Sequence, residues 1–202
     1  MMFFGNKFIM IINILKAADF KTTKWAGGST TELYIYPSTA TYAAGNFNFR
    51  ISSATVEIEK SNFTILPGVS RQLMVLKGSI KLSHKNHHLV RLNKNDIDSF
   101  EGNWETSTVG TCVDFNLMTK GNTSGKISSF SVSADKTLNF QLESTCEFII
   151  FYAYEGNLKV DFSSEMRNVN QGELLVIQHP INEVVKLQSP ENCAMAVVHI
   201  FK

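Results

Sequence analysis

The sequence predicts an all-β protein that contains two similar β-barrels. Apolar and polar residues alternate from residue 30 onward, which is the period of half-buried strands. Turn-forming pairs such as Pro67-Gly68, Gly102-Asn103 and Gln171-Gly172 separate the alternating runs. A segment of the first half also returns in the second half. Many short strands between turns, present in two copies, favour paired sandwiches or barrels over a helical fold.

The composition is that of a folded globule without a strongly charged partner. The chain has 202 residues, of which 44% are hydrophobic and 18% charged, and its net charge is +1. Without a basic or acidic block, neither nucleic acid nor an anionic membrane is expected as a partner. Its three cysteines form no CxxC pair, so neither a zinc ribbon nor a disulfide framework is indicated. We therefore expect a reducing, cytoplasmic location.

The beginning of the chain contains an apolar run, residues 8–15, that resembles a short signal-peptide core. The run is too short to span a bilayer, and Asn13 interrupts it. No convincing small-residue cleavage site follows. We expect Ile11–Leu15 to be a buried first strand and residues 1–9 to be a frayed or misassigned extension, with Met1 and Met10 as alternative starts.

The next distinctive segment is Lys24–Leu33, which carries the paired glycines Gly27 and Gly28. Glycines suit a shaped loop better than a strand core. We expect a loop that runs into a strand, a junction where binding groups are often placed. The strands expected after it are residues 33–36, 47–59, 71–76, 79–83, 88–92, 111–118, 126–132, 148–154, 158–162, 173–177, 184–187 and 194–201.

The internal repeat relates residues 77–82, K-G-S-I-K-L, to residues 155–160, E-G-N-L-K-V. Each copy follows an apolar strand and precedes a turn, another strand and a second turn at nearly the same distance. This order is typical of a jelly-roll barrel of the cupin type, and two copies make a bicupin. The turn-rich run 119–125 then separates an N-terminal barrel, residues 1–120, from a C-terminal barrel, residues 121–202, with exchange of terminal strands between them allowed.

The histidines do not follow the pattern of a metal-binding cupin. Such a site needs two histidines one residue apart on a strand, a nearby carboxylate and a third histidine on a later strand. His84, His87 and His88 instead surround an expected hairpin turn, while His179 and His199 lie near strand ends. We interpret the first three as a solvated turn, with an accidental surface metal site as the alternative, and predict no catalytic metal and no cofactor.

Other catalytic motifs are missing from the sequence. It has no phosphate-binding glycine loop, no G-x-S-x-G and no HExxH. Cys112 and Cys193 lie in apolar strands, so we expect buried packing and not nucleophilic chemistry.

The positions of charged residues on the expected strands are more informative. In residues 47–60, Arg50 and Ser52 share a face with Val56 and Ile58 if the strand is unbroken. A bulge at residues 52–53 would reverse this arrangement. An inward guanidinium must pair with a protein carboxylate or with an anionic ligand.

Further candidates lie on neighbouring strands. Arg71 shares a face with Leu73 and Val75, and Asp114 shares a face with Asn116. These side chains could converge on one cavity together with Arg50, or they could be structural ion pairs at the rim of a barrel.

Two more candidates lie in or beside the glycine-containing segment. Glu32 is placed by alternation on the face of Tyr34 and Tyr36. Trp25 either packs against the protein or stacks on a ligand, and the residues alone leave both interpretations open.

Taken together, six motifs of the first half resemble the HutD/Ves family of bicupins in their order and spacing. Each motif alone is weak, whereas the set is specific. They are K-W-A-G-G-x-T-x-E-L at 24–33, F-x-F-R-I-S at 47–52, F-x-x-L-P-G-x-x-R-x-L at 63–73, L-K-G at 76–78, F-x-G-x-W-x-T at 100–106 and D-F-N-L-M at 114–118.

The resemblance implies a cytoplasmic bicupin without a catalytic metal and with a polar pocket in the first barrel. It also implies an association with histidine utilisation or stress responses, and no reaction is firmly assigned to the family. The chain departs from the family at Ala26, Ser29 and Asn103, where asparagine, glycine and an acidic residue are usual. The pocket residues implied by the resemblance are Trp25, Thr31, Glu32, Arg50, Arg71, Asp114 and Asn116.

Our leading functional hypothesis is a small-molecule-binding bicupin with a regulatory role. Arg71 or Arg50 would clamp a small polar carboxylate, with Asn116 and Thr31 as neutral hydrogen-bonding groups and Trp25 on the apolar side. Urocanate and formylglutamate are ligands suggested by the family association. We do not favour enzymatic activity.

Two alternatives remain open. One is a metal-free cupin isomerase, epimerase or hydrolase that uses Glu32 or Asp114 as general base. The other is a scaffold of two barrels without a ligand. A homodimer is expected by analogy with cupins, whose sheets often pair.

Overall fold

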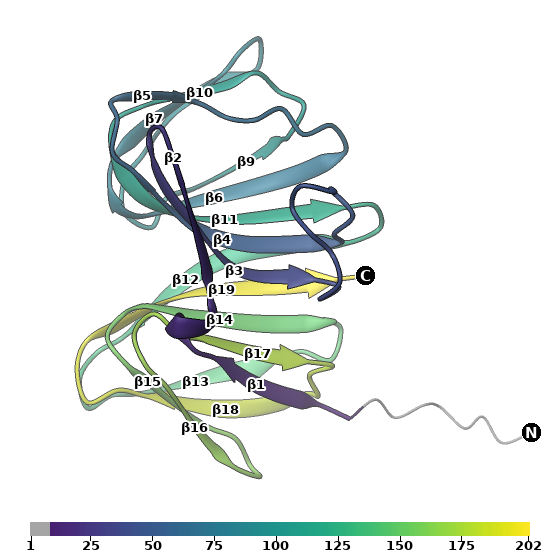
Figure 1. The fold of residues 1–202 in the computed structure, drawn as a ribbon. Helices are drawn as coiled ribbons and strands as arrows, with labels where there is room; N and C mark the ends of the chain where they lie inside the picture. The colour runs from purple at the N-terminus through teal and green to yellow at the C-terminus, as the bar shows by residue number, and fades with distance from the viewer. Residues whose placement is uncertain (1–8) are drawn as a thin grey trace, which may run out of the picture. The chain divides into compact units, whose positions relative to one another are not determined.

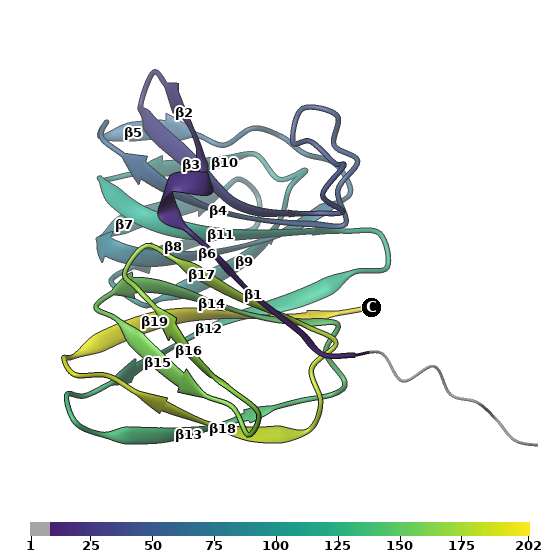
Figure 2. The ribbon, with the colours of Figure 1, turned by 60° about the horizontal axis from the view of Figure 1, so that its bottom comes forward.

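The computed structural model describes residues 9–202, and Figures 1 and 2 show their strands in two orientations. The expected N-terminal extension lies mostly outside the described residues. The chain divides into two compact units: an N-terminal unit, Ala18–Ser129, and a C-terminal unit that combines the residues up to Ala17 with Phe130–Lys202. The domain boundary expected between residues 120 and 121 stays a prediction.

The N-terminal unit consists of a six-stranded sheet in the order β2-β3-β4-β11-β6-β9 and a four-stranded sheet in the order β5-β10-β7-β8. The short 3-10 helix Ala17–Asp19 precedes it. Its strands are β2 (Lys21–Trp25), β3 (Gly28–Tyr36), β4 (Phe49–Val56), β5 (Lys60–Asn62), β6 (Val69–Gly78), β7 (Ile80–His84), β8 (His88–Leu92), β9 (Ile97–Glu101), β10 (Thr106–Val109) and β11 (Cys112–Lys120).

The C-terminal unit repeats this plan with a five-stranded sheet, β1-β17-β14-β19-β12, and a four-stranded sheet, β13-β18-β15-β16. The strand β12 begins in the N-terminal unit and ends in the C-terminal one. The strands are β1 (Ile11–Leu15), β12 (Ser124–Val132), β13 (Thr137–Leu142), β14 (Phe148–Glu155), β15 (Leu158–Asp161), β16 (Met166–Val169), β17 (Leu174–Gln178), β18 (Glu183–Gln188) and β19 (Cys193–Phe201).

The internal repeat of the sequence corresponds to a repeat of topology. Strand β6 lies between β11 and β9, as β14 lies between β19 and β17. Each repeat glycine has a positive φ, 85° at Gly78 and 71° at Gly156. A Cβ would lie 2.6 Å from the Thr111 carbonyl oxygen at the first and 2.7 Å from the Asn192 carbonyl oxygen at the second. Both positions therefore require glycine. The two units with their matching strand plans confirm the predicted bicupin fold.

Side chains that alternate inward from the paired sheets form each core. Fully buried residues of the C-terminal unit include Phe151, Ile149 and Val160, and those of the N-terminal unit include Leu73 and Leu82. All three cysteines are buried and free, as expected for Cys112 and Cys193. None of the described residues belongs to a helix that is long and apolar enough to cross a membrane.

The structure corrects two details at the start of the chain. The first strand is present, but it is an edge strand with Ile11 44% exposed, so it is not buried as predicted. The segment Lys24–Leu33 is a β-hairpin and not a loop, since β2 and β3 pair on either side of Ala26 and Gly27. Gly28 is needed there because a Cβ would lie 1.9 Å from the carbonyl oxygen of Thr55 on β4.

Candidate functional site

The N-terminal unit contains a cavity of about 630 Å³ on one face of its six-stranded sheet. Strands β4, β6 and β11 supply its polar wall, and the β2-β3 hairpin supplies Lys21, Thr23, Trp25, Thr30 and Glu32. Residues 40–43 and 61–64, which lie outside the six-stranded sheet, complete the lining. The cavity has the size of a small-molecule site.

Strand register explains why the charged side chains converge. Strand β4 pairs with β11 without a shift, so the bulge that would have turned Arg50 outward is absent from β4. Met118 of β11 lies opposite Arg50 of β4 and Arg71 of β6, which places both arginines in one row across three strands. Asn116 and Asp114 follow at two-residue steps on the same face of β11.

Glu32 lines the cavity, but the predicted face-sharing with Tyr34 and Tyr36 is wrong. The pairing of β3 with β4 shifts register between Glu32 and Tyr34, so Leu33 is an extra residue. This bulge reverses the strand's faces. Both tyrosines consequently stack on Phe49, at ring-centroid distances of 5.7 and 5.5 Å.

Thr31 does not line the cavity in the structure. Its hydroxyl lies 2.8 Å from that of Thr22 on the neighbouring strand β2. Thr30, which shares the face of Glu32, lines the cavity instead. Trp25 lines it too and is 40% exposed at the end of the hairpin.

The Arg50 guanidinium is held by protein groups. Its Nε donates to Oε2 of Glu32 at 2.6 Å, and its Nη1 donates to the Ser52 hydroxyl at 3.1 Å. The ring of Tyr42 lies 4.5 Å from the guanidinium carbon. Arg50 therefore has a carboxylate partner and an aromatic partner within the protein.

Arg71, unlike Arg50, is surrounded mainly by aromatic rings. It is 7% exposed, and its guanidinium carbon lies 4.8 Å from the ring centroid of Phe63 and 5.1 Å from that of Phe100. Its Nε is buried without a hydrogen bond, and among the described residues Arg71 forms no ion pair. Burial lowers the pKa of Arg71, whereas Tyr42 and Asp114 oppose the change. The charge persists, because arginine is not deprotonated in proteins.

Asp114 is the buried carboxyl group of the cavity wall, with 2% exposure. Burial raises its pKa to about 7, although hydrogen bonds from the Asn116 amide and the Ala54 backbone N–H favour the charged form, as does the positive charge of Arg71. The Nδ2 of Asn116 donates a hydrogen bond to Oδ1 of Asp114 at 2.5 Å. Both protonation states are populated near neutral pH.

Cys112 beside this carboxyl group is not an activated nucleophile. Burial and the neighbouring Asp114 raise the pKa of its thiol to about 12. The thiolate that nucleophilic attack requires is therefore scarce at neutral pH.

Sequence reasoning missed the aromatic side chains that lie over the two arginines. Phe63 is part of the F-x-x-L-P-G motif, which was a usable signal. Tyr42 lies in a loop without periodicity, so no pattern indicated it. The sequence placed Ser52 on the correct face but did not indicate it as a site residue. In the structure its hydroxyl accepts a hydrogen bond from Arg50.

Comparisons with known proteins agree with this architecture. The HutD family model matches residues 17–195. The chain is similar to the conserved protein PA5104 from Pseudomonas aeruginosa PAO1, with a TM-score of 0.83, 20% identity, and coverage of 95% of this chain and 100% of that chain. It is also similar to HutD from Pseudomonas fluorescens SBW25, with a TM-score of 0.72, 19% identity, and coverage of 95% and 98%.

More distant matches include a mutant oxalate decarboxylase from Bacillus subtilis. Its TM-score is 0.69 at 8% identity, with coverage of 92% of this chain and 76% of that one. At these identities, the structural matches establish the cupin fold alone. No curated protein matches the sequence.

Proposed function

Because the chain belongs to the HutD family, we propose that its N-terminal unit binds a small polar carboxylate and that the protein is a regulatory bicupin. The observation that carries this proposal is Arg71, a buried cation on the cavity wall whose Nε has no hydrogen-bond partner within residues 9–202. A buried charge without a partner is costly, and an anion removes that cost.

The charges around the cavity favour an anionic ligand over a cation. Glu32 is already paired with Arg50. Asp114 is only partly ionised near neutral pH. Arg71 therefore presents positive charge that the protein neutralises incompletely, and a carboxylate can accept two parallel hydrogen bonds from one guanidinium.

The rest of the lining suits a small acid with a polar substituent and an apolar or planar body. Asn116 and Thr30 offer neutral hydrogen-bonding groups, with Thr30 in the role first assigned to Thr31. Trp25 and Phe63 supply apolar surface. The candidates are urocanate and formylglutamate, from the family's association with histidine utilisation. Formate is a smaller probe, and a HutD structure is described in a formate condition.

Thermal-shift titration with these three acids tests the proposal. We expect at least one acid to raise the melting temperature of the wild type and Arg71→Ala to abolish the shift. The control is Arg91→Ala, which removes an exposed arginine of β8 that does not line the cavity, and it should keep the shift. A shift that persists in Arg71→Ala, or that is also lost in Arg91→Ala, would remove Arg71 from the binding site.

A metal-free enzyme is the second candidate function, and one observation favours it. Asp114 is a carboxyl group with a pKa of about 7 on the wall of the cavity, where a general base would operate. Glu32 is a weaker candidate because its carboxylate is bound to Arg50. Incubating the protein with each acid that binds, followed by NMR of the mixture, tests this alternative. Turnover that Asp114→Asn abolishes would establish an enzyme, and unchanged ligand would exclude turnover of that acid.

A further inference from the structure

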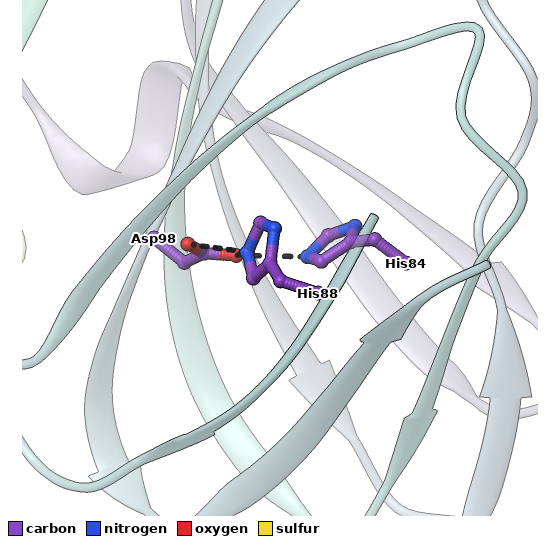
Figure 3. Close-up of side chains that lie close together, drawn as sticks. All are labelled: His84, His88 and Asp98. Atoms are coloured by element: carbon purple, nitrogen blue, oxygen red, sulfur yellow. Dashed lines mark hydrogen bonds and ion pairs between the residues drawn. The ribbon is translucent and has the colours of Figure 1, made fainter. Parts of the chain in front are cut away.

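A second group of polar side chains lies outside the cavity, where the β7-β8 hairpin meets β9 (Figure 3). His84 Nε2 lies 2.8 Å from Oδ2 of Asp98. His88 Nε2 lies 3.1 Å from both oxygens of the same carboxylate. The three residues therefore direct two imidazole nitrogens and a carboxylate at one point.

Burial shows that this group is more than a solvated turn. The His84 side chain is inaccessible and that of Asp98 is 13% exposed, whereas His88 is 39% exposed. The interpretation of His84 as part of a solvated turn is therefore wrong, although His87 and His88 are exposed as expected. The group is buried on the side of His84 and open to solvent on the side of His88.

We propose that His84, His88 and Asp98 bind one divalent transition-metal ion, with solvent in the remaining coordination positions. One ligand atom from each residue lies within 4.8 Å of the others. Donor atoms around a tetrahedral ion with bonds of about 2.0–2.1 Å are about 3.3 Å apart, so small side-chain movements complete the geometry. Two imidazoles and one carboxylate suit zinc, nickel, cobalt or iron(II) better than calcium or magnesium.

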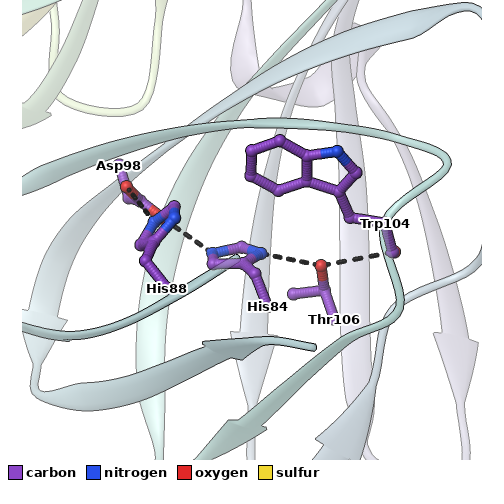
Figure 4. A network of polar contacts seen from close by, with 5 residues as sticks. All are labelled: His84, His88, Asp98, Trp104 and Thr106. Carbon is purple, nitrogen blue, oxygen red and sulfur yellow. Dashed lines mark hydrogen bonds and ion pairs between the residues drawn. The ribbon is translucent and has the colours of Figure 1, made fainter. Parts of the chain in front are cut away.

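The surroundings of His84 can hold its ring in the tautomer that a metal needs (Figure 4). Its Nδ1 lies 2.8 Å from the Thr106 hydroxyl, which in turn lies 3.4 Å from the Trp104 carbonyl oxygen. When the Thr106 hydroxyl donates to the Trp104 carbonyl, the hydroxyl oxygen accepts a hydrogen bond from Nδ1–H of His84. The Nε2 lone pair of His84 then faces Asp98. In that tautomer two acceptors face each other, an arrangement that a bound metal ion would stabilise.

Without a metal, the same hydroxyl serves the other tautomer. Thr106 then donates to Nδ1 of His84, and the Nε2 proton lies between the ring and Asp98. Binding an ion moves this proton from Nε2 to Nδ1 of the neutral ring and turns the hydroxyl. The group is thus satisfied in both states, as a reversible metal site requires.

The proposed metal site is separate from the cavity. Phe100 intervenes, with its ring centroid 4.6 Å from that of His84 and 5.1 Å from the Arg71 guanidinium carbon. None of the three ligands lines the cavity. An ion here would join the β7-β8 hairpin to β9 of the other sheet, so we infer a stabilising role that does not depend on the carboxylate ligand.

Trp104 offers an optical readout for this site. Its ring stacks on His87 at 3.7 Å and lies 5.6 and 5.9 Å from the rings of His84 and His88. In a Trp25→Phe background it is the remaining tryptophan. We propose titrating tag-free protein with Co²⁺ and following both quenching of Trp104 and visible absorption, then displacing Co²⁺ with Zn²⁺.

The expected result is saturable binding of one ion per chain, with visible Co²⁺ bands that Zn²⁺ removes. His88→Ala and Asp98→Asn should each weaken the affinity at least about tenfold, and Thr106→Val should weaken it about 10–100-fold while leaving the three ligands in place. His179→Ala removes a histidine of the C-terminal unit and should change nothing.

Failure to saturate would overturn the proposal. Equal affinity in wild type and His88→Ala would also overturn it, since His88 is exposed and its loss is not expected to unfold the protein. An equal loss in His179→Ala would assign the ion to another place. The metal titration contains no carboxylate ligand, so none of these outcomes bears on the carboxylate site, although the Trp25→Phe background changes one residue of the cavity lining.

Discussion

The Asp114→Asn substitution should destabilise the protein at acid pH and stabilise it at alkaline pH. The pKa of this carboxyl group is raised from 3.8 to about 7 by burial. Between these values the folded state binds a proton that the unfolded state does not, so the free energy of unfolding falls as pH rises. Asparagine cannot ionise and removes this loss.

The expected magnitude follows from the same two pKa values. A rise from 3.8 to about 7, at about 1.4 kcal/mol per unit, corresponds to about 4 kcal/mol of stability lost by the wild type. The variant loses about 1 kcal/mol at every pH, because its amide nitrogen replaces an accepting oxygen. Asp114→Asn should thus be about 1 kcal/mol less stable than wild type at pH 3 and about 3 kcal/mol more stable at pH 8.

Urea unfolding followed by tryptophan fluorescence measures this difference. Trp25 and Trp104 both belong to the N-terminal unit, so the signal reports the unit that contains Asp114. Subtracting the two curves cancels every other titrating group. Parallel pH dependence of wild type and variant, or a variant that is less stable at pH 8, would refute the assignment of a raised pKa to Asp114.

Three further predictions follow from the N-terminal unit. Arg50→Ala should lower the stability of this unit by about 2 kcal/mol in urea unfolding, because it leaves the partly buried Glu32 unpaired, and an unchanged midpoint would contradict this. Carboxylate affinity measured by calorimetry should fall about tenfold from pH 6 to pH 8, because Asp114 ionises near Arg71. The affinity of Asp114→Asn should not change over this range, and an equal fall in the variant would refute the explanation. Gly78→Ala should cost about 2 kcal/mol because φ is 85° and the added Cβ meets backbone, and a stability equal to wild type would contradict that strain.

The all-β fold could be predicted because short apolar or alternating runs are separated by turn-forming pairs. Strands β4, β6, β11 and β14 are central in their sheets, and most of their residues are buried, as expected for strands that pair on both sides. The short strand β10, Thr106–Val109, was missed because its sequence is nearly all polar. Thr106 and Thr108 are nevertheless buried, which depends on partners in distant segments.

The candidate site could be predicted where an unbroken strand fixes the direction of its side chains. Arg50, Asp114 and Asn116 were assigned to the correct faces for this reason. The bulge at Leu33 could not be predicted, because residues 32–36 alternate without interruption and contain no glycine or proline to mark a bulge. The reversal after it is what separated Glu32 from the tyrosines.

The histidine group illustrates a different limit. His84 and His88 are close in sequence, and their hairpin was predicted. The carboxylate of Asp98 comes from β9, a strand that alternation did not identify and that belongs to the other sheet of the unit. Only tertiary structure shows that the turn has a buried acidic partner.

The arginine Nε–H signals in a ¹H–¹⁵N NMR spectrum test the central claim most directly. The arginines are Arg50, Arg71, Arg91 and Arg167, so the spectrum is simple to assign by substitution. During titration with formate, urocanate and formylglutamate, we predict a saturable shift of the Arg71 signal, while that of Arg91 stays in place. An Arg71 signal that no acid moves, or one that moves only in step with Arg91, would contradict carboxylate binding at this buried guanidinium.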